Sequence, residues 1–375
     1  MIDSGSPDGH LNSMAPDLPR PRRVAPREGP HFAAGRWRPD LALVLAVALT
    51  WPAVCCLCVM TAASFAHAAD DAVAGREAPL AAWPLRSLSP AEERALQPPD
   101  HFKECASCPE MVVIPAGRFL MGSARGEGDR DEEGPGGQPF TVTIGAPYAL
   151  GQYLITVRDY LACVAETACP PPAWRDPTSL FNATTGVDEH YRRLGDALTN
   201  PSHPIVGITW KDAQSFMGWL NGKVGLKPSH GYRLPSEAEW ERGARGGRDS
   251  LKYFWGDRFS PNSANGAGQS GEDQWPFTSP VGSFPPNPYG LYDIAGNVWQ
   301  WIEDCYHPTY AGMPDAVIDT GTAWETACDA SGRRVLRGGS WIDLPRVLRV
   351  ADRGGSPPEM HYGYVGFRVA RTLAH

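Results

Sequence analysis

The most regular patterns in the chain are apolar residues at helical spacing. After Thr209, which can cap a helix, one apolar face is formed by Ala213, Phe216, Met217, Leu220 and Val224. Residues 236–239 have the Ser-x-x-Glu form of a capping box and predict a helix that ends at a Gly-Gly pair after residue 245. A third helix is expected from residue 157 and contains Cys163.

Strands are predicted where residues alternate between apolar and polar, or where short apolar runs lie between turn signals. The predicted strands cover residues 111–115, 141–144, 153–157, 335–337 and 366–370. Gly354, Gly355 and the prolines after them predict a loop. Residues 169–202, rich in proline at their start and polar in their middle, predict a long surface excursion that forms one wall of a groove.

Composition favours a folded domain with much irregular backbone. The 375-residue chain contains 40 Gly and 37 Pro, while 42% of its residues are hydrophobic. A hydrophobic core is therefore expected, but long helices and strands are not. The prolines of residues 69–104 predict a linker with at most a short helix near residues 90–96, and residues 105–372 are predicted to form one domain.

The first 68 residues have the pattern of an export signal. A Pro- and Arg-rich stretch is followed by residues 41–69, which carry no charge and contain the small-residue site Ala66-His67-Ala68. This pattern predicts cleavage after Ala68. The alternative is an uncleaved anchor through residues 41–66, because the apolar run is long enough to span a bilayer. Both interpretations predict an exported domain, periplasmic or secreted.

The charge balance argues against a nucleic-acid partner. Residues 1–68 hold six Arg and five acidic residues, which leaves 28 basic and 37 acidic side chains and a net charge of −9. An acidic exported domain lacks the basic surface that nucleic acid requires. A membrane partner is expected only if the signal stays uncleaved.

Cysteine usage fits an oxidising compartment. Outside the predicted signal, the cysteines form three close pairs: Cys105/Cys108, Cys163/Cys169 and Cys305/Cys328. Nearest-neighbour pairing predicts three disulfides, although six cysteines allow many other connectivities. The first pair has the C-x-x-C spacing of redox centres, but Pro109 and a β-branched run follow it where such centres have a helix. We therefore favour a structural disulfide there.

Six motifs follow one another along the chain. Five of them occupy residues 111–123, 153–157, 203–206, 232–241 and 290–301. The last lies in residues 333–371 and includes RVLRGGSW and the terminal GFRVAR. Together they resemble the sulfatase-modifying factor family, also called the formylglycine-generating enzyme family. The resemblance implies a single α+β domain with little regular secondary structure, a C-type-lectin-like organisation, disulfides and structural calcium.

Two groups of oxygen-bearing residues match the calcium sites of that family. From composition alone, such Asn, Asp and Gly residues are typical of turns. The resemblance implies calcium ligands instead, because this hard cation takes six to eight oxygens. The first site matches Asn265, Gly266, Asp273 and Trp275, the second and fourth through backbone carbonyls. The second site matches Asp293, Gly296, Val298 and Gln300, where an amide replaces a carboxylate and Asp293 restores a negative charge.

Copper-dependent chemistry is not expected. The resemblance implies oxidation of a protein cysteine to formylglycine, with copper held by two cysteine thiolates. Aligned from Gly338, those two positions are Asp343 and Leu348, neither of which supplies a thiolate. Cys305 and Cys328 are placed differently and are predicted to pair with each other. Four histidines are expected at the surface or in hydrogen bonds: His203, His230, His307 and His361. No two of them have the spacing of a two-histidine metal site.

The sequence is compatible with three functions. The first is that of a divergent exported family member with the nominal formylglycine-generating activity. The second is a non-catalytic module that binds a protein, a peptide or a glycan in the inherited groove. The third is an enzyme with a changed cofactor, in which Asp343 acts as a base or a metal ligand. By their position in the matched motifs, the candidate pocket residues are Trp299, Ser340, Asp343 and Arg353.

Overall fold

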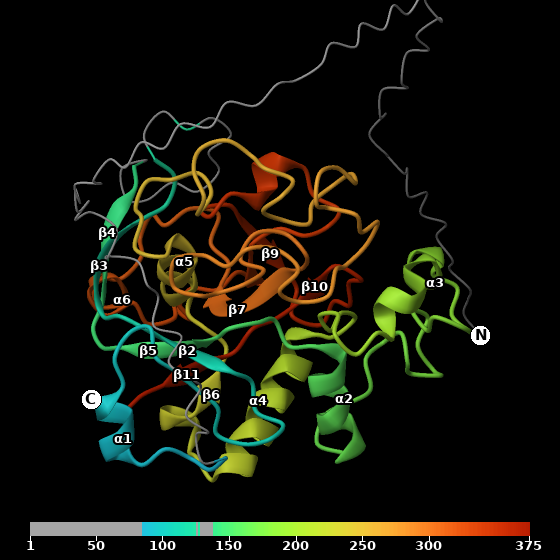
Figure 1. The fold of residues 1–375 in the computed structure, drawn as a ribbon, viewed down its shortest axis with the longest axis horizontal. Helices are drawn as coiled ribbons and strands as arrows, with labels where there is room; N and C mark the ends of the chain where they lie inside the picture. The colour runs from blue at the N-terminus through green and yellow to red at the C-terminus, as the bar shows by residue number, and fades with distance from the viewer. Residues whose placement is uncertain (1–84, 125–126, 128–137) are drawn as a thin grey trace, which may run out of the picture. The chain divides into compact units, whose positions relative to one another are not determined.

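The computed structural model describes residues 85–124, 127 and 138–375 (Figure 1). These residues all belong to one unit of the chain, Gly75–His375. The predicted export signal, residues 1–68, and the first part of the predicted linker, residues 69–84, lie outside the described residues. No helix in the described part of the chain is long and apolar enough to cross a membrane.

The helices are short. The α-helices of the described residues are α1 Pro90–Ala95, α2 Val157–Ala165, α3 Glu189–Leu194, α4 Trp210–Val224, α5 Glu237–Arg245 and α6 Asp315–Thr320. The 3₁₀ helices are η1 Gly195–Leu198, η2 Pro228–His230 and η3 Pro345–Leu348. The predicted helices after residues 156, 209 and 236 are confirmed as α2, α4 and α5, each with a capping box that satisfies its first backbone N–H groups. The short helix expected near residues 90–96 is confirmed as α1.

The strands form two sheets and a hairpin (Figure 1). Their bounds are β1 His101–Phe102, β2 Met111–Ile114, β3 Gly117–Met121, β4 Phe140–Ile144, β5 Tyr148–Gly151, β6 Tyr232–Arg233, β7 Trp299–Cys305, β8 Arg334–Arg337, β9 Arg353–Ser356, β10 Val365–Gly366 and β11 Ala370–Thr372. The five-stranded sheet has the order β1-β2-β5-β11-β6, the four-stranded sheet has the order β10-β7-β8-β9, and β3 pairs with β4. The mixed α and β content and the short elements confirm the predicted fold class.

The end of the chain connects the two sheets. β10 lies parallel to β7 in one sheet, and β11 pairs with β5 and β6 in the other. The sequence predicts one strand over residues 366–370, but the structure has two strand ends with a crossing between them. In the crossing, Phe367 O accepts a hydrogen bond from Ile155 N at 3.0 Å, and Val369 O accepts one from Gly151 N at 2.8 Å. These partners come from distant segments, so no local pattern predicts the crossing.

The predicted strand at residues 153–157 is wrong. The strand precedes it and ends at Gly151, and only Thr156 makes an isolated bridge, to Pro204. The apolar residues of this run are explained by burial, because Leu154 and Ile155 lie in the main core. An apolar run of this length therefore marks burial and does not by itself establish a strand.

The predicted loop at Gly354 and Gly355 is also wrong. These residues belong to β9, which pairs with β8 along its whole length. Gly355 is needed for close packing and not for a turn, because a Cβ built on it would lie 2.2 Å from the ring of Tyr306. A Gly-Gly pair in a strand gives the same sequence signal as a turn.

Two segments predicted to lie at the surface or in a linker contribute to the core. Residues 169–202 bury Tyr191 and Leu194 in the main cluster, and residues 85–104 bury Leu88 there. Helix α3 carries Tyr191 and Leu194, whereas Leu88 lies just before α1. A few apolar side chains on a mainly polar helix are enough to dock it.

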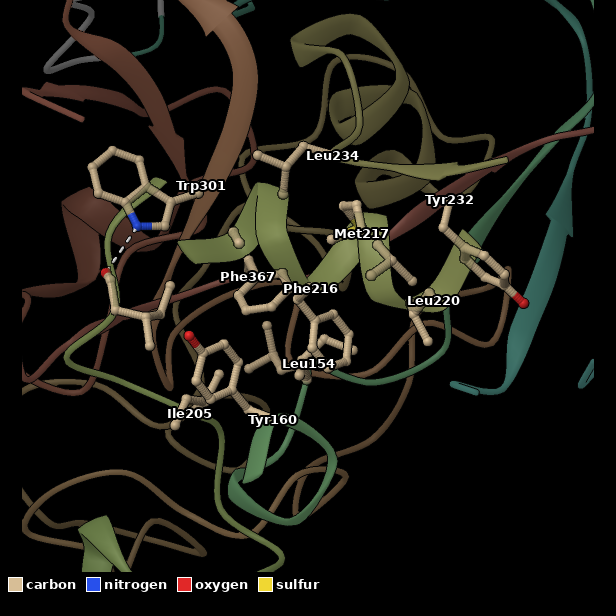
Figure 2. Close-up of a cluster of buried hydrophobic side chains, with 14 of the residues drawn as sticks. Leu154, Tyr160, Ile205, Phe216, Met217, Leu220, Tyr232, Leu234, Trp301 and Phe367 are labelled. Carbon is tan, nitrogen blue, oxygen red and sulfur yellow. Dashed lines mark hydrogen bonds between the residues drawn. The ribbon is translucent and has the colours of Figure 1, made fainter. Parts of the chain in front are cut away.

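The main hydrophobic core surrounds α4 and is drawn in Figure 2. The labelled side chains are Leu154, Tyr160, Ile205, Phe216, Met217, Leu220, Tyr232, Leu234, Trp301 and Phe367. Trp301 of β7 is fully buried, and its Nε1 donates to Ile208 O at 3.4 Å, the dashed line in Figure 2. The predicted apolar face of α4 is thus confirmed as part of this core.

The three predicted disulfides are confirmed. The Cα atoms are 4.9 Å apart in the first pair and 5.4 Å apart in each of the other two pairs: Cys105–Cys108, Cys163–Cys169 and Cys305–Cys328. The first closes the turn before β2, the second ties the end of α2 to the next segment, and the third holds the end of β7. Each disulfide closes a loop next to a short element and stabilises the fold by restricting the unfolded chain.

Helix α5 carries acidic side chains into the interior. Glu237 accepts two hydrogen bonds of 2.7 Å from the guanidinium of Arg353. Beside it, Asp304 accepts backbone N–H bonds of 2.8 Å from Glu237 and from Trp324. Burial, and next the charge of Glu237, raise the pKa of Asp304 to about 8. Asp304 therefore carries a proton in the fold where a solvent-exposed aspartate would be ionised.

We expect partial reduction and peptide mapping of the purified protein to give three linkages, one within each cysteine pair. The reason is that each pair already stands at disulfide distance in the fold. Alkylation before reduction should label none of the six cysteines. A linkage between two different pairs would contradict the assignment.

We expect Asp304 to make the protein less stable as the pH rises. An unfolded aspartate loses its proton near pH ~3.9, whereas Asp304 keeps it in the fold up to about 8. Between these values the native state binds a proton that the unfolded state releases, so the free energy of unfolding falls with rising pH. The slope contributed is at most about 1.4 kcal/mol per pH unit.

Urea unfolding at a series of pH values measures this effect. Asp304→Asn cannot ionise and should flatten the dependence of the unfolding free energy on pH relative to the unchanged protein. Asp319→Asn, at an exposed position of α6, is the matched control and should keep the original slope. Equal slopes in Asp304→Asn and the unchanged protein would show that Asp304 is ionised in the fold.

Candidate functional site

Ser340 and Asp343 form a closed turn after β8. The carboxylate oxygen Oδ2 of Asp343 accepts bonds from Ser340 Oγ at 2.6 Å and from Ser340 N at 3.0 Å. In return, Asp343 N donates to Ser340 O at 3.1 Å. The turn begins at Gly338 and Gly339, whose φ angles of 95° and 66° favour glycine. One oxygen of this carboxylate is therefore used to hold the loop.

Leu348 fills the second position that the resemblance matches to a copper thiolate. Its side chain is fully buried at the end of η3. A Cβ built on Gly339 would lie 2.6 Å from one of its methyl groups, and one built on Gly266 would lie 2.8 Å from the other. The leucine thus packs against bare backbone on both sides. This position offers hydrocarbon and no ligand atom.

The other two candidate pocket residues have separate partners. Trp299 begins β7, and its side chain is almost buried beside Gly354. The guanidinium of Arg353 is bound by Glu237 through two bonds. The structure therefore brings Ser340 into contact with Asp343, while it assigns the charge of Arg353 to Glu237.

The first predicted calcium set surrounds a tight loop. Asp273 Oδ2 accepts from Gly266 N at 3.0 Å, and its Oδ1 accepts from Trp275 N at 3.3 Å. Asn265 is fully buried, and its Nδ2 donates to Phe277 O at 2.9 Å. These bonds bring the amide of Asn265 and the carboxylate of Asp273 to the same loop, as the resemblance requires.

Two features of this loop fit a hard cation. Asn265 Oδ1 is a buried oxygen without a hydrogen-bond partner, and leaving such an atom unsatisfied costs about 1–3 kcal/mol. Asp273 is buried as well, and burial raises the pKa of its carboxyl group above the usual range. A cation beside these oxygens would satisfy the first and favour the ionised form of the second.

The second predicted calcium set does not offer the same opportunity. Gln300 Oε1 accepts from Trp240 Nε1 at 2.8 Å and from Arg368 Nε at 2.6 Å, so both of its lone pairs are used. The carboxylate of Asp293 accepts from Gly282 N at 2.8 Å and from the side chain of Asn297 at 3.1 Å. The other members, Gly296 and Val298, are buried. Gln300 therefore has no free lone pair for a cation, whereas each carboxylate oxygen of Asp293 accepts a single bond, so the second calcium site stays a prediction.

Asn297 and Arg368 organise this region and were not predicted as site residues. Asn297, at a φ of 64°, donates from its backbone N–H to Asn265 O at 2.9 Å. Arg368 is fully buried and binds the backbone oxygens of Gly151 and Tyr292 in addition to Gln300. The Gly-Asn pair before Val298 and the terminal GFR motif were the available signals, but neither indicates which segments the side chains reach.

The first calcium set and the turn of Asp343 are neighbours. Ala267 N donates to Asp343 O at 2.8 Å, and Gly266 lies against Leu348. The loop of residues 265–275 therefore packs against the loop of residues 340–348 and supports it. A change in one loop is expected to alter the position of the other.

The described residues do not fit a copper-thiolate centre. Cys305 and Cys328 are joined to each other, so neither sulfur is a thiolate. Within the described ranges, no three His, Cys, Asp or Glu side chains stand close enough to hold a metal ion. The four histidines considered above are each hydrogen-bonded, as expected: His203, His230, His307 and His361.

Comparison with known proteins relates the chain to a single family. The family model described as "Sulfatase-modifying factor enzyme 1-like domain" matches residues 97–373. The mouse protein named "Inactive C-alpha-formylglycine-generating enzyme 2" is 32% identical over 309 residues, which cover 71% of this chain and 87% of that protein. The formylglycine-generating enzyme of Streptomyces coelicolor is 32% identical over 296 residues, which cover 69% and 88%.

A solved structure agrees with these relatives. PvdO from Pseudomonas aeruginosa is 34% identical, has a TM-score of 0.59 and covers 74% of this chain and 100% of its own. The residues that the family model matches, 97–373, include both sheets and the loops around Asn265 and Asp343. The chain therefore belongs to the sulfatase-modifying factor family, also called the formylglycine-generating enzyme family.

Proposed function

We propose that this protein is an exported member of its family that has lost copper-dependent cysteine oxidation and binds a peptide or protein segment. The carrying observation is Leu348, a fully buried hydrocarbon side chain where the resemblance requires a thiolate. No rotamer of a leucine side chain presents a ligand atom to a metal, because the side chain contains only carbon and hydrogen. Loss of the thiolate removes a soft ligand that copper needs.

The residue matched to the other thiolate supports the same proposal. Asp343 is a hard oxygen ligand, and its Oδ2 holds the turn of Ser340. As a base or metal ligand, Asp343 would have only its other oxygen, Oδ1, outside these bonds, and among the described residues no group of three His, Cys, Asp or Glu side chains could hold a metal ion with it. We therefore favour a binding module over an enzyme with a changed cofactor.

Exposed apolar side chains supply a candidate binding face. On the loop of residues 340–348, Ile342 is 48% exposed and Leu344 is 55% exposed. The same loop meets residues 169–202, because Trp341 stacks on His190 with ring centroids 5.9 Å apart. That segment also exposes Leu180 and Val187. Exposed apolar side chains on two segments in contact are a candidate surface for binding protein.

The relatives and the disulfides bear on this proposal in different ways. One relative of 32% identity is named inactive and another of 32% identity is named as the enzyme, so identity alone does not decide between them. Asp343 and Leu348 favour a likeness to the inactive relative, because neither side chain supplies a thiolate. Three disulfides support an exported location, since they persist in oxidising compartments.

We expect the purified protein to form no formylglycine. The assay adds copper and a cysteine-containing peptide of the sulfatase type and follows oxygen consumption and aldehyde formation by mass spectrometry. The expected result is no product, because Asp343 and Leu348 supply no thiolates. The formylglycine-generating enzyme of Streptomyces coelicolor serves as the positive control. Aldehyde formation by the unchanged protein would overturn the proposed loss of activity.

Binding of the same peptide tests the second half of the proposal. We expect saturable binding that weakens severalfold in the double variant Ile342→Ser/Leu344→Ser, since each change removes apolar surface worth about 25 cal/mol per Å² buried. Leu85→Ser is the matched control, because Leu85 is 60% exposed and lies outside the candidate face. Equal affinity in the double variant and the control would place the binding face elsewhere.

We further propose one structural calcium ion, at the loop of Asn265 and Asp273. Elemental analysis should find about one calcium per chain, and chelation should lower the melting temperature by several degrees, because a ligand at a hundredfold excess over its Kd stabilises the native state by about 2.7 kcal/mol. Asp273→Asn should abolish the shift, while Asp319→Asn should keep it. A shift that persists in Asp273→Asn would move the ion to another site.

A further inference from the structure

A cleft lies apart from the loops described so far. Its volume is about 550 Å³, within the size range of ligand sites. One wall is formed by α4, β6 and the start of α5, and the other by residues 320–325 after α6. The cleft shares no residue with the loop of residues 340–348 or with the two predicted calcium sets. The inference therefore goes beyond the proposed peptide-binding function and does not rest on it.

Three carboxylates reach this cleft, and two of them have a cationic partner. Glu239 is bound by Arg233 through two bonds of 2.6 Å. Glu325 stands 3.5 Å from Arg334, which also stacks on Trp210. The charges of Glu239 and Glu325 are thus compensated within the protein.

Glu303 is the exception. Its Oε2 accepts a bond of 2.7 Å from the neutral amide of Gln214. None of the described cationic side chains forms an ion pair with Glu303, and its Oε1 has no partner among the described residues. Burial raises the pKa of this carboxyl group, while the hydrogen bond from Gln214 and the charges of Arg334 and Arg233 act in the opposite direction. The amide of Gln214 fixes the direction in which the free oxygen points.

The rest of the lining is suited to a hydrocarbon stem. Met217, Pro228 and Ala323 contribute apolar surface to the same cleft. A ligand with an aliphatic stem and a cationic head would cover these residues and place its charge at Glu303. Such a head also forms the charge-assisted hydrogen bond that Gln214 alone cannot supply.

We propose that the cleft between α4 and residues 320–325 binds an organic cation with an aliphatic stem, through a charge-assisted hydrogen bond to Glu303. The lysine or arginine side chain of a polypeptide and a free aliphatic amine share this chemistry. A divalent metal is not the ligand we infer, because two of the three carboxylates are bound by arginines. Because the amide of Gln214 is neutral, one cationic group of a ligand can balance the charge of Glu303.

The test is a ligand-observed NMR titration of the purified protein. The probes are three capped tripeptides with lysine, arginine or norleucine between glycines, and putrescine as the free amine. We expect the lysine or the arginine peptide to bind with a Kd of about 1 mM or tighter, and the norleucine peptide to bind at least about tenfold more weakly. Saturation by putrescine as well extends the site to free amines. No saturation by any of the three cations overturns the proposal.

Matched variants assign the binding to Glu303. Glu303→Gln should weaken binding of the cationic probe by about tenfold or more, since a charge-assisted hydrogen bond exceeds a neutral one. Glu189→Gln, the same change at an exposed residue of α3, should leave the affinity unchanged. The melting temperature of Glu303→Gln should equal or exceed that of the unchanged protein, because an uncompensated charge is removed. Unchanged affinity in Glu303→Gln overturns the proposal.

A further variant separates this inference from the proposed function. Ile342→Ser/Leu344→Ser changes the candidate peptide face and should leave the affinity for the cationic probes as it was. Loss of sulfatase-type peptide binding in that variant, with cation binding retained, shows two independent sites. Loss of cation binding in that variant would contradict the location that we infer.

Discussion

The fold depends on guanidinium groups that the C-terminal part of the chain buries. Arg337, Arg368 and Arg371 are each fully buried, and a buried guanidinium needs ion-pair or hydrogen-bond partners in place of water. Arg371 meets this condition through Glu93 of α1 and Glu104, which join the N-terminal end of the described chain to strand β11. The arginines therefore require the sheets, the helices and the loops to assemble around them together.

Arg368 extends this constraint to the candidate site. Its guanidinium gathers backbone oxygens from the end of β5 and from residue 292, and it also binds Gln300 of β7. The segment fixed in this way contains Asn297, which holds the backbone of Asn265. Asn265 in turn begins the loop that supports Asp343. A single buried charge thus sets the geometry of two loops that carry the proposed functions.

The same framework explains how chemistry can change while the fold persists. Leu348 occupies a space bounded by Gly266 and Gly339, and the surrounding backbone is held by hydrogen bonds that do not involve its side chain. A leucine at this position adds apolar contacts to the core and, at the same time, supplies no ligand atom. Family membership alone therefore does not establish activity, because the same fold can carry different site residues.

The sequence by itself determined the features that depend on neighbouring residues. The caps of α4 and α5, the start of α2, the apolar face of α4 and the three disulfide pairs were predicted, because each rests on contacts between residues close in the chain. Only the tertiary structure decided the rest. Strand β9, the crossing between β10 and β11, and the pairing of Gln300 with Arg368 depend on partners from distant segments, whose approach no local pattern encodes.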